Sequence, residues 1–184
     1  ALLFPAMLLA YGIYAYATDR PVEREVRLLM VQQNADSWAP GSFEAVLEKA
    51  QRLSLEGTEE APEPVDMVVW SETSLRRPYH TWRDYYRENP RNQSFTDFLA
   101  EVGRPILTGS PIPGDAGYMN GALLISPDGE IQGSYGKRQL VPFAERVPFW
   151  DWEPMRNLFQ TYIGLQAVWT PGTSTEPLPV TLSS

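Results

Sequence analysis

Hydrophobic and polar positions follow a strand pattern in several short parts of the chain. Short, mostly apolar runs at 26–32, 66–70 and 105–109 are typical of buried strands. Residues 118–125 and 130–135 flank a Pro-Asp-Gly turn and predict a β-hairpin. The sequence therefore predicts three single strands followed by a hairpin.

Helical spacing of apolar positions appears between these strands. A helix is expected after Ser42, with the serine as its N-cap, and a second after Ser94. Asp97 follows Ser94 at the spacing of a capping box, and Gly103 is expected to end that helix. A short helix is expected at 153–162. Strands and helices thus alternate.

The remaining parts of the chain read mostly as loops. Residues 57–64 are acidic and contain proline, and residues 141–148 also lack a regular period. Residues 78–92 are polar and aromatic without a clear period, and they receive no assignment. The order of elements favours an α/β layered sandwich over an all-helical or all-β domain.

The first seventeen residues differ from the rest because they contain no charged side chain. As a helix they would extend about 26 Å, slightly less than the hydrocarbon core of a bilayer. We expect the end of a transmembrane helix. A signal-peptide remnant is an alternative, since 15–17 fits an A-x-A cleavage pattern, and a buried core helix is another. Pro5 and Gly12 weaken the core-helix alternative.

Composition limits the possible partners and chemistries. The net charge is −8, with 15 basic and 23 acidic residues, which argues against binding to nucleic acid. The chain has no cysteine and one histidine, His80. Disulfides, thiolate metal sites and a cysteine nucleophile from these residues are therefore excluded. His80 alone has no set of partners for a metal and is expected at the surface.

Three segments carry candidate chemistry. Residues 31–34 end the first strand, and Trp-Ser-Glu-Thr after the second places Glu72 just beyond a strand end. The string Lys-Arg-Gln-Leu-Val-Pro-Phe-Ala-Glu places Lys137 after the hairpin and Glu145 eight positions later. Each residue alone would most often be a surface charge. Their joint order makes all three candidates for a catalytic site.

In this order the segments resemble the nitrilase, or carbon-nitrogen hydrolase, superfamily, and within it the apolipoprotein N-acyltransferase family. The resemblance implies an α/β fold, a nitrilase-like αββα sandwich that is incomplete here, preceded by the end of a transmembrane helix. It implies a transmembrane tail at 1–18, a linker at 19–25, and a nitrilase-like domain at 26–184 that is truncated on its C-terminal side.

The resemblance also implies an activity. A glutamate, Glu72, acts as general base on a cysteine thiol, and Lys137 stabilises the oxyanion of the tetrahedral intermediate. The acyl group passes from a phospholipid to a cysteine thioester and then to the N-terminal diacylglyceryl cysteine of a lipoprotein. Glu145 would hold Lys137 or tune its charge. No metal or cofactor is implied. The enzyme would lie in the bacterial inner membrane, with this domain on the periplasmic face.

Other residues fit the family less completely. Trp38 lies in the loop where the acyltransferases carry a functional tryptophan, although a packed loop aromatic is an equal alternative. Asn120 matches a family asparagine and is expected to be structural. Gly136, Gln139 and Ala144 depart from the family pattern around the lysine. The missing cysteine is the main departure. We expect this chain to be an inactive fragment of a protein with a cysteine shortly beyond 184.

Three alternatives stay open at this point. A soluble nitrilase-type amidase would share the fold and the charged residues. A catalytically dead domain would keep the fold only for binding. A Ser/His/Asp hydrolase would have to use His80, but the chain has no G-x-S-x-G motif.

Overall fold

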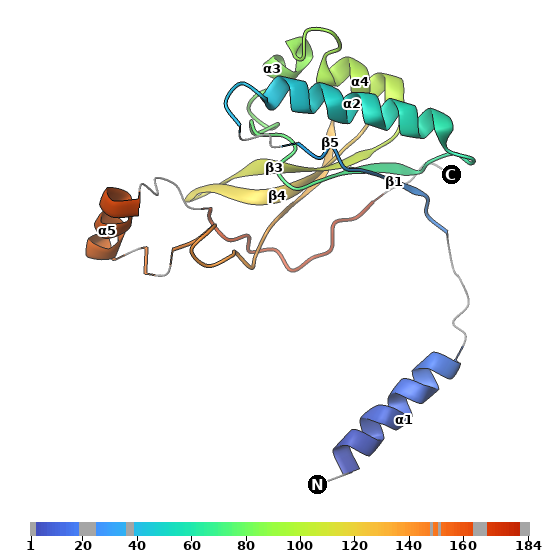
Figure 1. Cartoon of the computed structure of the whole chain (residues 1–184), viewed down its shortest axis with the longest axis vertical. Helices are drawn as coiled ribbons and strands as arrows, with labels where there is room; N and C mark the ends of the chain where they lie inside the picture. The colour runs from blue at the N-terminus through green and yellow to red at the C-terminus, as the bar shows by residue number, and fades with distance from the viewer. Residues whose placement is uncertain are drawn as a thin grey trace.

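The computed structural model describes residues 3–18, 25–35, 39–147, 149–150, 152–163 and 169–180. A mixed five-stranded sheet in the order β1-β2-β3-β4-β5 forms the centre of the fold (Figure 1). The strands are β1 (Leu28–Val31), β2 (Met67–Trp70), β3 (Ile106–Gly114), β4 (Gly117–Ile125) and β5 (Ile131–Gly136). The first three strands are mutually parallel, and β4 and β5 continue the sheet as an antiparallel meander. The predicted strands and hairpin are confirmed.

Helices cover one face of this sheet. Three helices pack there: α2 (Phe43–Glu60), α3 (Arg83–Glu88) and α4 (Phe95–Val102) (Figure 1). The predicted helix near 153–162 is present as α5 (Glu153–Ile163), which projects beyond the sheet. On the opposite face the described C-terminal residues 169–180 cross the sheet. Leu178 packs against Gly133 of β5, where an added Cβ would lie 2.6 Å from Leu178 Cδ1.

The core lies between the sheet and these three helices and is rich in aromatic rings. Trp70 of β2 stacks on Phe98 of α4 at a centroid separation of 5.5 Å. Its indole N–H donates to the Ser54 hydroxyl of α2 over 2.8 Å, so the buried polar atom is satisfied. Tyr79, Tyr86 and Phe95 form a further cluster of ring contacts. These contacts fix the end of β2, from which the candidate site begins.

The two expected N-caps have different outcomes. Ser94 caps α4 as predicted, because its Oγ accepts from the Asp97 N–H over 3.0 Å, and Gly103 ends the helix at φ 60°. Ser42 precedes α2 without a side-chain cap bond, and its hydroxyl donates instead to the Ala39 carbonyl over 2.7 Å. The capping role predicted for Ser42 is wrong, since its φ and ψ are helical and turn the hydroxyl away from the first turn of the helix.

Two elements extend beyond their predicted ends. Helix α2 continues through Gly57 to Glu60, because the absence of a Cβ at Gly57 lets the helix lie against Leu29 of β1; a Cβ there would be 2.8 Å from Leu29 Cδ1. Strand β3 continues through Pro111 and Pro113 to Gly114. Its pairing with β2 stops at Leu107, so the prolines occupy a part of β3 that has β4 on one side only, where proline is tolerated.

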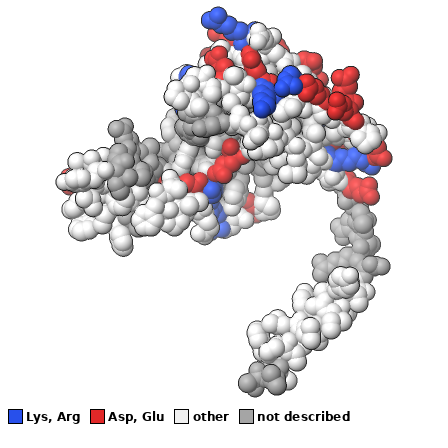
Figure 2. Space-filling model, in the orientation of Figure 1, with Lys and Arg blue, Asp and Glu red and all other residues white. Residues whose placement is uncertain are grey.

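The N-terminal apolar segment forms helix α1 (Leu3–Ala17), which has no buried residue and no Lys, Arg, Asp or Glu (Figure 2). It stands apart from the sheet in Figure 1. A helix with both the length and the apolar character required to cross a bilayer is not found in the described parts of the chain. Most of the expected linker, 19–24, lies outside the described residues.

Candidate active site

Glu72 follows β2 by two residues and lies in a tight turn. Thr73 has a positive φ of 57°, and the Ser74 hydroxyl donates to the Ser71 carbonyl over 2.8 Å. Gly109 of β3 lies directly against this turn, because a Cβ at Gly109 would come within 2.7 Å of the Glu72 Cα. The close approach places Glu72 at the carboxyl end of β2, and its side chain is 59% exposed.

Lys137 directly follows β5, and its backbone is tied to β4. Its N–H donates to the Asn120 carbonyl over 2.7 Å. Its ammonium group donates to Glu145 Oε1 over 2.9 Å and to Glu72 Oε1 over 3.3 Å. Two residues that are 65 and 8 positions away from Lys137 in sequence are therefore brought to one amine.

Glu145 is held within the 141–146 turn. The Val141 N–H donates to Glu145 Oε2 over 2.8 Å, and the Glu145 N–H returns to the Val141 carbonyl over 2.9 Å. Phe143 takes a positive φ of 64° to close the turn. The Glu145 side chain is only 13% exposed, against 33% for Lys137. Both carboxylate oxygens of Glu145 are thus held, Oε2 by the backbone of the turn and Oε1 by side chains from outside it.

Asn120 of β4 joins the two carboxylates, which the sequence reading did not anticipate. Its Nδ2 donates to Glu145 Oε1 over 2.9 Å and also to Glu72 Oε1. Asn120 is buried, and its own carbonyl accepts the Lys137 N–H. Gly121 pairs with Gly136 across the β4–β5 hairpin, and this register, which the sequence does not reveal, places Asn120 beside Lys137. Asn120 thus contacts all three charged residues, and its structural role stays a prediction.

The electrostatics follow from this closed arrangement of one cation and two anions. Hydrogen bonding to Glu145, and then to Glu72, raises the pKa of Lys137 despite some desolvation, so its amine is a firmly held cation. Burial opposes the ionisation of Glu145, but hydrogen bonds from Val141, Lys137 and Asn120 outweigh it and lower its pKa. At neutral pH Lys137 is therefore an ammonium and Glu145 a carboxylate.

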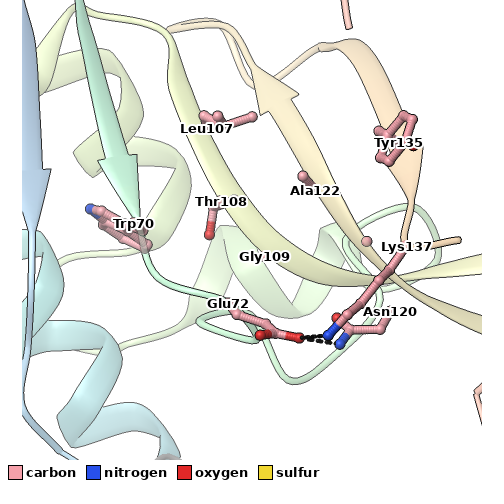
Figure 3. Close-up of a pocket in the computed structure, with 10 residues that line it drawn as sticks. Trp70, Glu72, Leu107, Thr108, Gly109, Asn120, Ala122, Tyr135 and Lys137 are labelled. Carbon is pink, nitrogen blue, oxygen red and sulfur yellow. Dashed lines mark hydrogen bonds and ion pairs between the residues drawn. The ribbon is translucent and has the colours of Figure 1, made fainter. Parts of the chain in front are cut away.

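A cavity of about 330 Å³ opens beside these residues on the sheet face opposite the helices (Figure 3). Glu72, Asn120 and Lys137 converge at one end of it, and Leu107, Ala122 and Tyr135 lie along the strands. Within the described part of the chain, the buried Thr108 hydroxyl at its wall has no hydrogen-bond partner. The charged groups thus stand at the end of a mainly apolar surface.

Trp38 and His80 were also named from the sequence. Trp38 lies outside the described residues. His80 was expected at the surface but is half-buried, and burial followed by the charge of Arg83 lowers its pKa. It does not line the cavity at Lys137. The described residues contain no group of three or more His, Cys, Asp or Glu side chains that could hold a metal ion.

Known proteins offer a direct comparison. No protein-family model matches the chain. It is 38% identical over 188 residues to "Apolipoprotein N-acyltransferase 2" of Treponema pallidum (strain Nichols), which covers 88% of this chain and 34% of that protein. It is also 38% identical over 176 residues to "Apolipoprotein N-acyltransferase 2" of Treponema denticola, covering 94% of this chain and 34% of that protein. The chain thus spans about one third of the length of these curated relatives.

Among solved structures, a carbon-nitrogen hydrolase from Helicobacter pylori G27 aligns with a TM-score of 0.46 and 18% identity. The alignment covers 63% of this chain and 40% of that chain.

Proposed function

We propose that the chain supplies the charged residues of an apolipoprotein N-acyltransferase active site. Most of the chain is homologous to apolipoprotein N-acyltransferases and matches about one third of their length. In the proposed reaction a fatty acyl group moves from a phospholipid to a cysteine thioester. It then moves to the free amine of the N-terminal diacylglyceryl cysteine of a lipoprotein. The five-stranded sheet would form one half of a nitrilase-like αββα sandwich.

A single observation carries this proposal. The Lys137 ammonium donates to two carboxylates from different parts of the chain, at 3.3 Å to Glu72 and 2.9 Å to Glu145. Catalysis of acyl transfer needs a base for the nucleophile and a positive charge for the oxyanion within reach of one another. The pair Glu72 and Lys137 provides both groups at the edge of an open cavity.

The two glutamates differ in a way that supports different roles. Glu145 accepts hydrogen bonds at both oxygens, from the Val141 N–H at Oε2 and from side chains at Oε1. Glu72 accepts only at Oε1, and no described residue bonds to its Oε2. We assign Glu72 as the general base, since it keeps a free oxygen for a proton, and Glu145 as the residue that holds Lys137.

The proposed reaction has two steps, acylation of the thiol and transfer of the acyl group to the amine. Glu72 takes the thiol proton, and the thiolate attacks the ester carbonyl of the phospholipid. Lys137 stabilises the tetrahedral oxyanion, which collapses to a thioester as the lysophospholipid oxygen leaves with the proton that Glu72 took from the thiol. The lipoprotein amine then attacks the thioester, and the thiol is restored as the amide forms. No metal or organic cofactor is needed for either step.

The thiol must come from outside these 184 residues, because the sequence contains no cysteine. By itself the chain would therefore lack the acyl-transfer activity. We propose that the uncharged helix α1 is the end of a transmembrane helix in a bacterial inner membrane. The sheet and its site would then face the periplasm.

Acyl transfer in the longest natural protein that contains this sequence tests the proposal. The substrates are a phospholipid with a labelled acyl chain and a synthetic diacylglyceryl peptide with a free N-terminal cysteine amine. We expect labelled amide product, with a loss of at least 100-fold in rate for Glu72→Gln and for Lys137→Ala. Glu130→Gln is the matched control and should keep the rate, since Glu130 is an exposed carboxylate that pairs with Arg83 in the turn between β4 and β5.

The same assay separates the alternatives. Hydrolysis of simple amides without phospholipid turnover would favour a nitrilase-type amidase. Absence of both reactions, in a folded protein that contains a cysteine near the site, would favour a binding domain without catalysis. Full activity of Glu72→Gln and Lys137→Ala would remove these residues from the mechanism.

A further inference from the structure

A four-residue segment near the end of the chain runs alongside the site without contributing a side chain to it. This segment, Trp169-Thr170-Pro171-Gly172, is called the 169–172 segment below. Its three N–H groups donate to three main-chain carbonyls, and Pro171 has no N–H to donate. Trp169 donates to Glu145 over 3.0 Å, Thr170 to Tyr118 over 2.9 Å, and Gly172 to Lys137 over 2.9 Å.

The three accepting carbonyls belong to the parts of the chain that carry the site. Two of them are the carbonyls of Glu145 and Lys137 themselves. The third belongs to Tyr118, two residues before Asn120 on β4, and it also accepts the Thr170 hydroxyl over 3.1 Å. One short segment therefore connects the 141–146 turn, the start of β4 and the residue after β5.

From this geometry we propose that the 169–172 segment is a positioning element that sets the spacing between Lys137 and Glu145 by holding their main chains. The catalytic meaning of that spacing rests on the proposed function, whereas the holding itself does not. Without the segment, the hydrogen bonds that Lys137 and Glu145 keep among the described residues would be those within their own loop, those to β4 and the ion pair of Lys137 with Glu72.

Close approach of two glycines makes the arrangement possible. A Cβ on Gly172 would lie 2.9 Å from the Gly136 Cα and 2.5 Å from the Gly136 carbonyl carbon, which are backbone atoms that cannot rotate away. A Cβ on Gly136 would likewise lie 3.2 Å from the Gly172 Cα. Gly172→Ala should therefore push the segment off β5 and break its bond to Lys137.

The chain offers a direct readout of this change because it has two lysines, Lys49 and Lys137. Trace acylation with acetic anhydride across a range of pH, followed by peptide mass spectrometry, gives the reactivity of each amine. Lys49 on α2 serves as the internal reference. Lys137 faces the carboxylates of Glu72 and Glu145 together with the neutral amide of Asn120.

In the unmodified chain we expect the labelling curve of Lys137 to rise only at high pH, because its hydrogen bonds to Glu145 and Glu72 stabilise the protonated, unreactive amine. In Gly172→Ala the curve should move to lower pH as the spacing to Glu145 is lost. Each unit of displacement raises the labelling of Lys137 at a fixed pH about tenfold relative to Lys49. An unchanged Lys137 curve in folded Gly172→Ala would overturn the proposal.

Gly133→Ala is the matched control. Its Cβ would meet the flexible side chain of Leu178, in the same C-terminal stretch but away from the three hydrogen bonds. This variant should leave the Lys137 curve in place. An equal displacement in both variants would contradict a specific role for the 169–172 segment.

Amide hydrogen exchange of the unmodified chain keeps the proposal testable if Gly172→Ala does not fold. The amides of Trp169, Thr170 and Gly172 should exchange as slowly as those of the β4–β5 ladder. Exchange as fast as in an unstructured peptide would overturn the proposal. Neither measurement involves acyl transfer. A displaced Lys137 curve, together with no acyl transfer by the longest natural protein that contains this sequence, would refute the proposed function and leave the positioning role intact.

Discussion

Asn120 donates from a single amide nitrogen to Glu145 over 2.9 Å while the same nitrogen also reaches Glu72. A neutral donor thereby holds two carboxylates near one another and leaves Lys137 as the cation of the cluster. A second cation would cancel the negative charge that a base requires. The amide instead relieves repulsion between the two glutamates and preserves their charge.

Replacing this amide by a carboxylate should disrupt the cluster. Asn120→Asp turns a buried donor into a third acceptor facing Glu72 and Glu145. We expect a loss of about 2 kcal/mol in the free energy of unfolding at pH 7, measured by urea denaturation. The loss should shrink at acidic pH, as the new carboxyl takes up a proton.

The control for this variant is Asn92→Asp. Asn92 donates to a single exposed carboxylate, that of Glu48, over 3.0 Å. Asn92→Asp should change the free energy of unfolding by less than about 0.5 kcal/mol. Equal effects of the two variants would mean that the bridging position of Asn120 has no special importance.

Removing the ammonium should weaken the acid dependence of stability that Glu145 contributes. In the folded chain the pKa of Glu145 is lowered from its ordinary 4.5, so its ionised form adds stability above that pH, which is lost as pH falls through the lowered value. Lys137→Met removes the cation and one hydrogen bond from Glu145, so only the hydrogen bonds from Val141 and Asn120 still oppose the effect of burial on its pKa. We therefore expect this variant to lose less stability than the unmodified chain as pH falls from 7 to about 4.5.

Urea denaturation at intervals between pH 4 and 8 measures this difference. Arg52→Met provides the control, because Arg52 pairs with Glu56 on the exposed face of α2. Its stability should follow the pH dependence of the unmodified chain. Parallel curves for Lys137→Met and the unmodified chain would contradict the proposed coupling.

The turn that carries Glu72 should depend on the missing side chain of Gly109. In Gly109→Ala the new Cβ would lie 2.7 Å from the Glu72 Cα and 2.8 Å from its carbonyl carbon. We expect a loss of about 2 kcal/mol in the free energy of unfolding, since backbone atoms must move. Gly12→Ala has open space around the new Cβ and should be neutral or stabilising. Similar thermal midpoints for both variants would refute the packing argument.

Helix capping offers a test that is independent of the site. Ser94→Ala removes the acceptor for the Asp97 N–H and should cost about 1 kcal/mol. Ser42→Ala removes no cap bond and should cost less, although Ser42 also precedes a helix. Chemical denaturation of the two variants should rank them in this order. The reverse order would show that the serine before α2 is the more important one.

Much of the fold could be predicted because strands and amphipathic helices have clear local periods. The hairpin around 126–130 and the cap at Ser94 follow from turn and cap chemistry within a few residues. Helix α3 could not be predicted, since Arg83–Glu88 is short and is stabilised by distant rings such as Phe95. The end of α2 was missed for a similar reason, because the fit of Gly57 against Leu29 is a tertiary contact.

The candidate site shows the same division. Glu72, Lys137 and Glu145 could be selected by their order and neighbours in the sequence. The shared Nδ2 of Asn120 could not, because it depends on the register that places Asn120 beside Lys137 across the β4–β5 hairpin. The role of the 169–172 segment was equally hidden, as its hydrogen bonds involve only backbone atoms, which a sequence pattern does not reveal.

The mixed sheet also implies an order in which the cluster assembles during folding. Asn120, Lys137 and Glu145 lie within 25 residues and belong to the antiparallel meander and its following turn, whose pairings are local in sequence. Glu72 arrives from 48 residues before Asn120, on parallel strands that require long crossover connections. Local pairings form faster than distant ones. Lys137 should therefore meet Glu145 first, and pulse-labelling hydrogen exchange should show β4 and β5 protected before β1 and β2.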